Sequence, residues 1–187
     1  MINYHKEVLR FKNSGRIKKT FEFKRLGGGC QTKFARMYSR QQASQLRQEF
    51  WTAFGQYMAP VTSSENESVN WINYRTGQKN IFFRMHADNR QTYIGIELTH
   101  VDPTARQFYF TQLKKWKNLL EEFTGEAWTW QTEASDEQEK RISRIFIHMN
   151  GVSVMNKSDW PKIISFLKPR IIALDAFWNQ VKEGLRS

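Results

Sequence analysis

The chain has 187 residues and a net charge of +11; 40% of its residues are hydrophobic, and 14 Phe, 7 Trp and 6 Tyr are among them. This apolar content suffices for a core and excludes a chain that is disordered throughout. A single cysteine, Cys30, excludes an internal disulfide and a metal site made of several thiolates. No apolar run reaches the ~18 residues of a membrane span, and no secretory signal pattern is present. We therefore expect a cytoplasmic protein that does not enter a membrane.

The positive charge is concentrated at the N-terminus. Residues 1–36 contain ten basic and two acidic side chains, a net charge of +8, whereas residues 37–187 contain 19 basic and 16 acidic ones, a net charge of +3. An excess of this size attracts nucleic acid phosphates. The basic residues most suited to such contacts are Lys18, Lys19, Lys24 and Arg25.

Residues 1–36 are predicted to be a flexible basic extension, because their four phenylalanines have neither helical nor strand spacing. The segment is interpreted first as an upstream extension before a true start at Met37. The alternatives are a nucleic-acid-binding arm and, less in keeping with its composition, an organelle presequence. In a competing arrangement, Phe21 and Phe23 form an extra edge strand on the sheet of the domain.

A first helix is predicted over residues 40–58. Ser39 and Gln42 have the spacing of a capping box, in which the hydroxyl and the amide each satisfy an otherwise unpaired backbone N–H. Apolar residues recur at helical spacing behind this cap, and Pro60 ends the segment. The polar, serine-rich stretch 59–68 is predicted to be a loop.

Three short strands are predicted over residues 69–75, 80–87 and 92–100. Each alternates apolar and polar side chains, and Gly77 and the sequence Asp-Asn-Arg-Gln supply the turns between them. Short turns between consecutive strands predict an antiparallel sheet. The inward face of the second and third strands carries Ile81, Phe83, Met85, Ile94, Ile96 and Leu98.

A second helix is predicted from Pro103 to Gly125. Asp102 is a suitable N-terminal cap, proline is favoured at the first helical position, and Gly125 is a natural C-terminal stop. His100 and Asp102 form a short polar pair at this point. We interpret the pair as a helix cap beside an unrelated histidine.

Two further strands are predicted over residues 127–133 and 141–149, and a final helix begins near Asp159. Pro169 inside this helix removes a backbone N–H and predicts a kink or a break. The element order is helix, three strands, helix, two strands, helix. The sequence therefore predicts one α+β domain over residues 37–187 with a mostly antiparallel sheet.

This order is compatible with a restriction-endonuclease-like core, which makes metal-dependent nuclease chemistry worth testing. Such a core needs an acidic residue near the end of the second strand and an acid-x-Lys pair in the third. Asp88 has the required position, but Thr99 stands two residues after Glu97 where a lysine is needed. The pair Glu22 and Lys24 lies outside the domain. A divergent nuclease is therefore kept as the alternative function.

Other catalytic patterns are missing from the sequence. The four histidines lack the spacing of a metal site, and the glycine-rich stretch at residues 27–29 lacks the lysine and hydroxyl residue of a phosphate-binding loop. No serine has the context of a nucleophile elbow, and Cys30 has no base near it in sequence. We predict no catalytic residue, no metal ligand and no cofactor.

One surface of the predicted sheet combines aromatic rings with charges, a composition on which bases stack and phosphates bind. It consists of Tyr74, Phe82, Arg84, His86, Tyr93 and Glu97. Because sheets in α+β domains are usually packed, we expect a helix to cover this face, with Arg84 and Glu97 paired. The alternative is an open nucleic-acid-binding surface. In both cases the adjoining turns add positive charge through Arg75, Lys79 and Arg90.

Three sequence blocks carry a family resemblance: YSRQQASQLRQEFWTAFGQYM, WINYRTGQKNIFFRM and GVSVMNKSDWPKIISFLKPRIIALDAFW. They resemble a bacterial family of small uncharacterised proteins that contain a domain of unknown function, and the resemblance covers about residues 37–187. It implies an intracellular α+β domain without an assigned activity. Similar domains occur behind nuclease-like domains in longer proteins. The resemblance therefore implies a non-catalytic binding or accessory module with nucleic acid or a nuclease as its partner.

Overall fold

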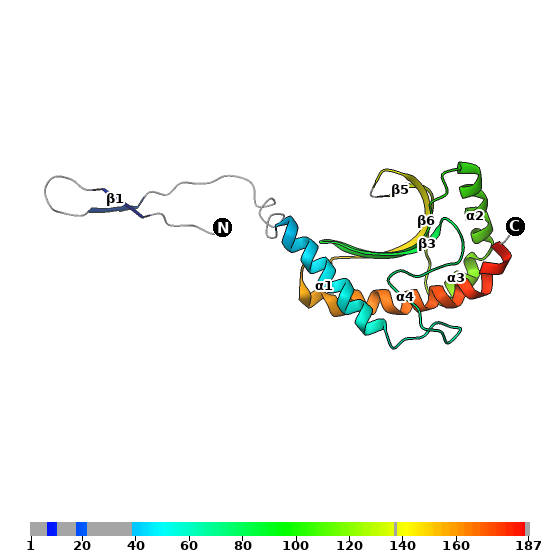
Figure 1. Cartoon of the computed structure of the whole chain (residues 1–187). Coiled ribbons are helices and arrows are strands. Elements are labelled where there is room, and N and C mark those ends of the chain that lie inside the picture. The colour runs from blue at the N-terminus through cyan, green and yellow to red at the C-terminus, as the bar shows by residue number, and fades with distance from the viewer. Residues whose placement is uncertain (1–6, 11–17, 22–38, 137, 186–187) are drawn as a thin grey trace. The chain divides into compact units, whose positions relative to one another are not determined.

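The computed structural model describes residues 7–10, 18–21, 39–136 and 138–185 (Figure 1). Two compact units, Met1–Tyr38 and Ser39–Ser187, make up the chain. No helix of the described residues is long and apolar enough to cross a membrane.

The first unit contains two short strands, β1 (Glu7–Arg10) and β2 (Lys18–Phe21). They pair antiparallel, with Glu7 opposite Phe21, in a two-stranded sheet of their own. Phe21 therefore does belong to a strand, but its partner is β1 and not the sheet of the second unit. Phe23 lies outside the described residues.

The second unit begins with α1 (Arg40–Met58), as predicted. The capping box is present: Gln42 N–H donates to Ser39 Oγ at 3.2 Å, and Ser39 N–H donates to Gln42 Oε1 at 2.9 Å. The buried side of α1 carries Phe50, Phe54 and Met58. Local capping and a periodic apolar stripe were thus sufficient to locate this helix.

The main sheet contains β3 (Ile81–Ala87), β4 (Gln91–Leu98), β5 (Thr129–Ser135) and β6 (Arg141–Asn150). All neighbours pair antiparallel, in the spatial order β3-β4-β6-β5. On the core face, Phe83 lies opposite Ile96, which lies opposite Ile145. These side chains are buried, as the alternating pattern predicted.

The predicted strand over residues 69–75 is wrong. This segment is an irregular loop, because the Asn70 carboxamide oxygen accepts hydrogen bonds from the backbone N–H groups of Ile72 and Asn73. Such bonds fold the chain back on itself and compete with strand pairing. The Trp71 indole is buried and donates to the Val61 carbonyl oxygen at 2.9 Å. The apolar residues of the loop therefore fill the core without entering the sheet.

The single helix predicted from Pro103 to Gly125 is two helices, α2 (Pro103–Lys115) and α3 (Lys117–Thr124). The expected ends are confirmed: Asp102 caps the first, and Gly125 closes the second in the left-handed region with φ 71°. The break falls at Trp116, whose φ of −100° and ψ of 20° are not helical. The Trp116 indole packs against Gly184, where an added Cβ would lie 3.0 Å from the ring. Docking of this ring therefore accompanies the break.

A long helix, α4 (Trp160–Val181), completes the domain between two short 3₁₀ turns, Lys157–Asp159 and Lys182–Leu185. The break predicted at Pro169 is wrong, because α4 continues through the proline as one helix. The side chains of Leu167 and Ile171 on either side of the proline are fully buried, and their burial offsets the ~3 kcal/mol that an internal proline costs.

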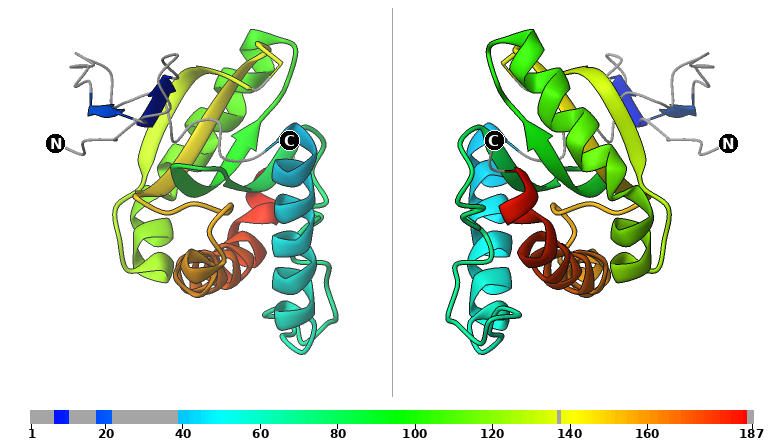
Figure 2. Two further views of the ribbon diagram at one scale, coloured as in Figure 1. Left: turned by 90° about the vertical axis from the view of Figure 1, so that its left-hand side faces the viewer. Right: turned by 90° about the vertical axis from the view of Figure 1, so that its right-hand side faces the viewer.

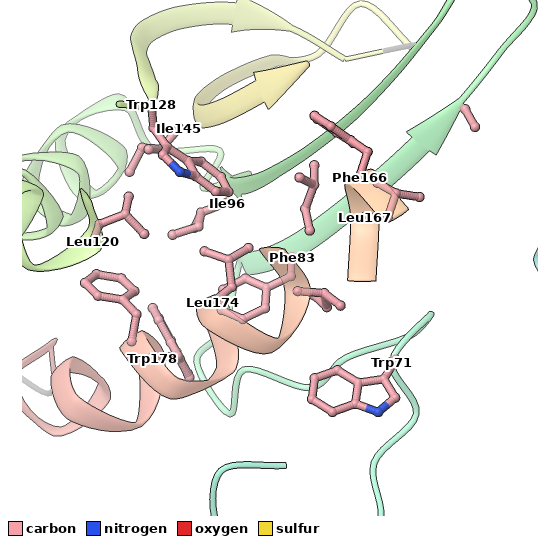
Figure 3. Packing of buried hydrophobic residues seen from close by; sticks show 14 of the residues in the cluster. Trp71, Phe83, Ile96, Leu120, Trp128, Ile145, Phe166, Leu167, Leu174 and Trp178 are labelled. Atoms are coloured by element: carbon pink, nitrogen blue, oxygen red, sulfur yellow. The ribbon is translucent and has the colours of Figure 1, made fainter. Parts of the chain in front are cut away.

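The four α-helices in the described part of the chain all pack on one face of the main sheet (Figures 1 and 2). Figure 3 shows the core between them, where Leu174 and Trp178 of α4 meet Phe83 and Ile96 of the sheet. The sheet curls away from the helices, so its other face is concave (Figure 1). The α+β class is confirmed, with two consecutive strands after α1 in place of three.

Candidate functional site

The concave face of the sheet carries the rings and charges that the sequence singled out. Side chains that alternate with core residues on β3, β4 and β6 point to this side, and strand register aligns them in rows. We use the name concave face for Phe82, Arg84, His86, Tyr93, Glu97, Arg144, Phe146 and His148.

The expectation that a helix covers this face is wrong. The chain leaves β4 and returns to the sheet at β5 through α2 and α3 on the core side, where α1 and α4 also lie (Figures 1 and 2). Every helix of the described residues therefore packs on the same face. The side chain of Arg84 is 50% exposed as a result.

Four rings form a row across three strands. His86 stacks on Tyr93 with ring centroids 5.4 Å apart. Tyr93 meets the edge of Phe146 at 6.4 Å, and Phe146 stacks on His148 at 6.0 Å. Rings in such a row offer flat apolar surface to another planar group.

Two guanidinium groups border this row. Arg84 lies 4.6 Å from the centroid of the Phe82 ring, and Arg144 lies 4.6 Å from that of Phe146. Arg144 Nε also donates to Gln131 Oε1 on β5 at 2.9 Å, which fixes the plane of its guanidinium. The cations therefore lie against aromatic faces, where each retains donors for an external anion.

Glu97 is a nearly buried carboxylate on β4, the middle strand of the concave face, and is 8% exposed. Its Oε1 accepts from the Tyr93 hydroxyl at 3.2 Å. Its Oε2 lies 3.9 Å from Arg84 Nε, so the predicted pairing of Arg84 with Glu97 is confirmed as an ion pair. Burial raises the pKa of Glu97; the Tyr93 hydrogen bond and the charges of Arg84 and Arg144 oppose this, and the charge of Asp136 adds to it.

We expect Glu97→Gln to stabilise the fold relative to the native chain more at neutral than at acidic pH. A raised pKa means that ionisation of Glu97 opposes folding, so the native chain loses stability as pH rises from the ordinary pKa of 4.5 through the higher folded value. Urea unfolding of both proteins at about pH 4 and about pH 7 measures the difference. A variant that gains relative stability at the lower pH would contradict this sign.

Five of the six predicted surface residues meet on the concave face; Tyr74 does not, because it belongs to the loop that replaced the predicted strand. Its hydroxyl donates to Asp175 Oδ1 at 2.6 Å, and its ring stacks on Phe83 on the core side. Arg75 and Lys79 are exposed in the same loop.

Arg90 is exposed in the turn between β3 and β4. Of the four N-terminal candidates, Lys18 and Lys19 stand in β2, and Lys24 and Arg25 lie outside the described residues. The nucleic-acid contacts suggested for all of these residues remain predictions.

The contribution of β6 was missed. Arg144, Phe146 and His148 alternate with core residues in the same way as Phe82, Arg84 and His86 in β3. This alternation was visible in the sequence. Only the strand order, with β6 beside β4, places the two sets on one surface.

The positions of Asp88 and Glu97 bear on the alternative function as a metal-dependent nuclease. The Asp88 N–H donates to the Gln91 carbonyl oxygen in the turn, and Glu97 stands six positions after Gln91 in β4, so the backbone positions of the two acidic residues are about 20 Å apart. That distance is far beyond what one metal ion can bridge. Asp88 Oδ1 instead accepts from the N–H groups of Arg90 and Gln91. Within the described part of the chain, no three His, Cys, Asp or Glu residues gather in a possible metal site.

A separate pocket of about 550 Å³ lies between the loop before β3 and α4. Asp175 in its wall is fully buried and accepts from Ser64 N–H and the Tyr74 hydroxyl, both at 2.6 Å. Burial, followed by the hydrogen bond to Asp175 and its charge, raises the pKa of Tyr74 well above its ordinary value. Lys182 is bound by Glu65. These polar groups satisfy one another, so they hold the loop on the helix.

Comparison with known families places the concave face in a defined domain. A family model described as Domain of unknown function (DUF4268) matches residues 46–182, which is more than half of the chain. The chain belongs to this family. The DUF4268 segment contains the whole concave face, the pocket and all four α-helices in large part. No curated protein and no solved structure matches the chain.

Proposed function

We propose that this DUF4268 domain is a non-catalytic module that binds single-stranded nucleic acid on its concave face, in the cytoplasm. The observation that carries the proposal is the row of His86, Tyr93, Phe146 and His148, bordered by two arginines. Bases stack on such rings irrespective of sequence, at about 1–3 kcal/mol per base, while guanidinium groups bind the phosphates.

A single strand is the occupant that suits this surface better than a duplex does. The rings stand on one face of a sheet that curls, and bases can reach them only when they are not stacked inside a double helix. The basic segment 1–36 on the same chain adds a sequence-independent attraction to phosphates. The likeness to domains that follow nuclease-like domains favours a role in holding a strand for a nuclease partner.

Replacing the central ring tests the proposal. We expect Phe146→Leu in the full chain to weaken binding of a fluorescent ten-nucleotide oligothymidine about tenfold, because leucine preserves apolar volume but cannot stack on a base. Fluorescence anisotropy at fixed salt measures the affinity. The matched control is Tyr57→Leu, since Tyr57 is 51% exposed on α1 and also lies under a cation, Lys168. Equal affinities for the native chain and Phe146→Leu would refute the proposal.

The salt dependence of the affinity measures what the charge of Arg84 contributes to binding. Arg84→Gln should reduce the slope of log affinity against log salt by about 0.7, the value for one lost phosphate contact on a single strand. Lys168→Gln removes the same charge from α4, on the other side of the sheet, and should leave the slope unchanged. If both variants change the slope equally, general net charge and not the concave face governs binding.

A further inference from the structure

We propose that Glu97 recognises guanine, by accepting hydrogen bonds from the N1–H and the exocyclic N2–H groups of a base stacked on the concave face. This inference rests on the proposed single-strand binding and names the base that the surface selects. The concave face combines two arginines and four rings with one buried carboxylate, Glu97.

A carboxylate is unfavourable on a surface that binds only phosphates. It repels the backbone, and its burial has a cost that the raised pKa of Glu97 reflects. The groups that face it are the Tyr93 hydroxyl, the two guanidinium groups of Arg84 and Arg144, and the carboxylate of Asp136. A ligand that donates hydrogen bonds can bind to the Glu97 carboxylate, whereas a phosphate cannot.

The carboxylate of Glu97 keeps acceptor capacity for this ligand. An ionised carboxylate has about four acceptor positions. One position on Oε1 receives the Tyr93 hydroxyl, and Oε2 faces Arg84 Nε at 3.9 Å, which exceeds hydrogen-bond distance. The Arg84 side chain is half exposed, so it can turn toward a phosphate and leave Oε2 to the base.

Register places Glu97 where a stacked base would present its edge. Glu97 lies between Phe82 on β3 and Arg144 on β6, and Tyr93 precedes it by four residues on the same face of β4. A base on the ring of Tyr93 or Phe146 therefore has this carboxylate beside it and an arginine on either side. Base edge and phosphate then meet groups of opposite charge.

Guanine is the base that a carboxylate fits best. Its pairing edge has two adjacent donors, N1–H and N2–H, that match the two oxygens of a carboxylate. Adenine and cytosine each place an acceptor next to their one amino donor, and thymine and uracil have one donor between two acceptors. An acceptor facing Glu97 would be repelled, so a bidentate pair is available to guanine alone.

The test uses the full chain and four oligothymidines that differ at one central position: deoxythymidine, deoxyguanosine, deoxyinosine or deoxyadenosine. Deoxyinosine retains N1–H and lacks the N2 amino group. We expect the guanine oligonucleotide to bind about tenfold more tightly than the thymine one, with inosine between them, as for a bidentate base contact. Glu97→Gln should abolish the difference between guanine and inosine.

The outcomes of these experiments distinguish failure of guanine recognition from failure of single-strand binding. Equal binding of guanine, inosine and thymine oligonucleotides, or a guanine preference that survives in Glu97→Gln, overturns the recognition by Glu97. Equal oligothymidine affinities of the native chain and Phe146→Leu overturn single-strand binding itself. The comparison of the guanine and inosine oligonucleotides uses the native chain alone. It therefore tests recognition of the N2 amino group even if Glu97→Gln is poorly folded. Tyr93→Phe, which removes the hydroxyl from Oε1 and keeps the ring, should retain the guanine preference.

Discussion

Phe50→Ala is expected to lower the free energy of unfolding by about 3–5 kcal/mol, a large part of the stability of an ordinary domain. The Phe50 side chain on α1 is fully buried. Its ring meets the edge of Trp160 at the start of α4 with centroids 5.6 Å apart, and stacks near Phe54 at 6.3 Å. Alanine would leave a cavity where α1 joins α4, because aromatic neighbours on two helices cannot close it.

Urea unfolding followed by circular dichroism measures this loss. Phe108→Ala is the matched control, because Phe108 on α2 is 43% exposed and its removal should change stability by about 0.5 kcal/mol or less. A change below about 1 kcal/mol for Phe50→Ala would mean that this ring is not part of the core.

Elements with strong local signals were predictable. The Ser39 and Gln42 box located α1, and the alternation in residues 80–87 and 92–100 located β3 and β4 with the correct inward faces. These signals depend on neighbours within one turn or one hairpin. The loop at residues 69–75 shows the limit, since its alternation was overridden by the short-range hydrogen bonds of the Asn70 side chain.

Non-local features decided what the sequence left open. Whether α4 survives Pro169 depends on how much apolar surface its neighbours bury, and not on the proline alone. Which face of the sheet stays open depends on the side on which α2 and α3 cross from β4 to β5. The candidate site was therefore half predictable: Phe82, Arg84 and their strand neighbours followed from alternation, whereas the partners on β6 required the strand order.

The loop that replaced the predicted strand also depends on a contact distant in sequence. Asp175 on α4 is fully buried, and its two oxygens accept from Ser64 N–H and from the Tyr74 hydroxyl. These charge-assisted bonds attach both halves of the loop to α4. Their energy takes the place of the ladder hydrogen bonds that a strand would have made.

We therefore expect Asp175→Ala to lower the free energy of unfolding by about 2–4 kcal/mol, since both donors are left without their acceptor. Asn179→Ala is the matched control: its half-buried side chain donates to Ser64 Oγ at the same loop in a solvent-exposed hydrogen bond, so its loss should cost less than about 1 kcal/mol. A double-mutant cycle of Asp175→Ala with Tyr74→Phe isolates the hydrogen bond between them, with an expected coupling of about 1–2 kcal/mol. Additive effects of the two changes would show instead that the Tyr74 ring stabilises the loop by stacking on Phe83, independently of the buried carboxylate.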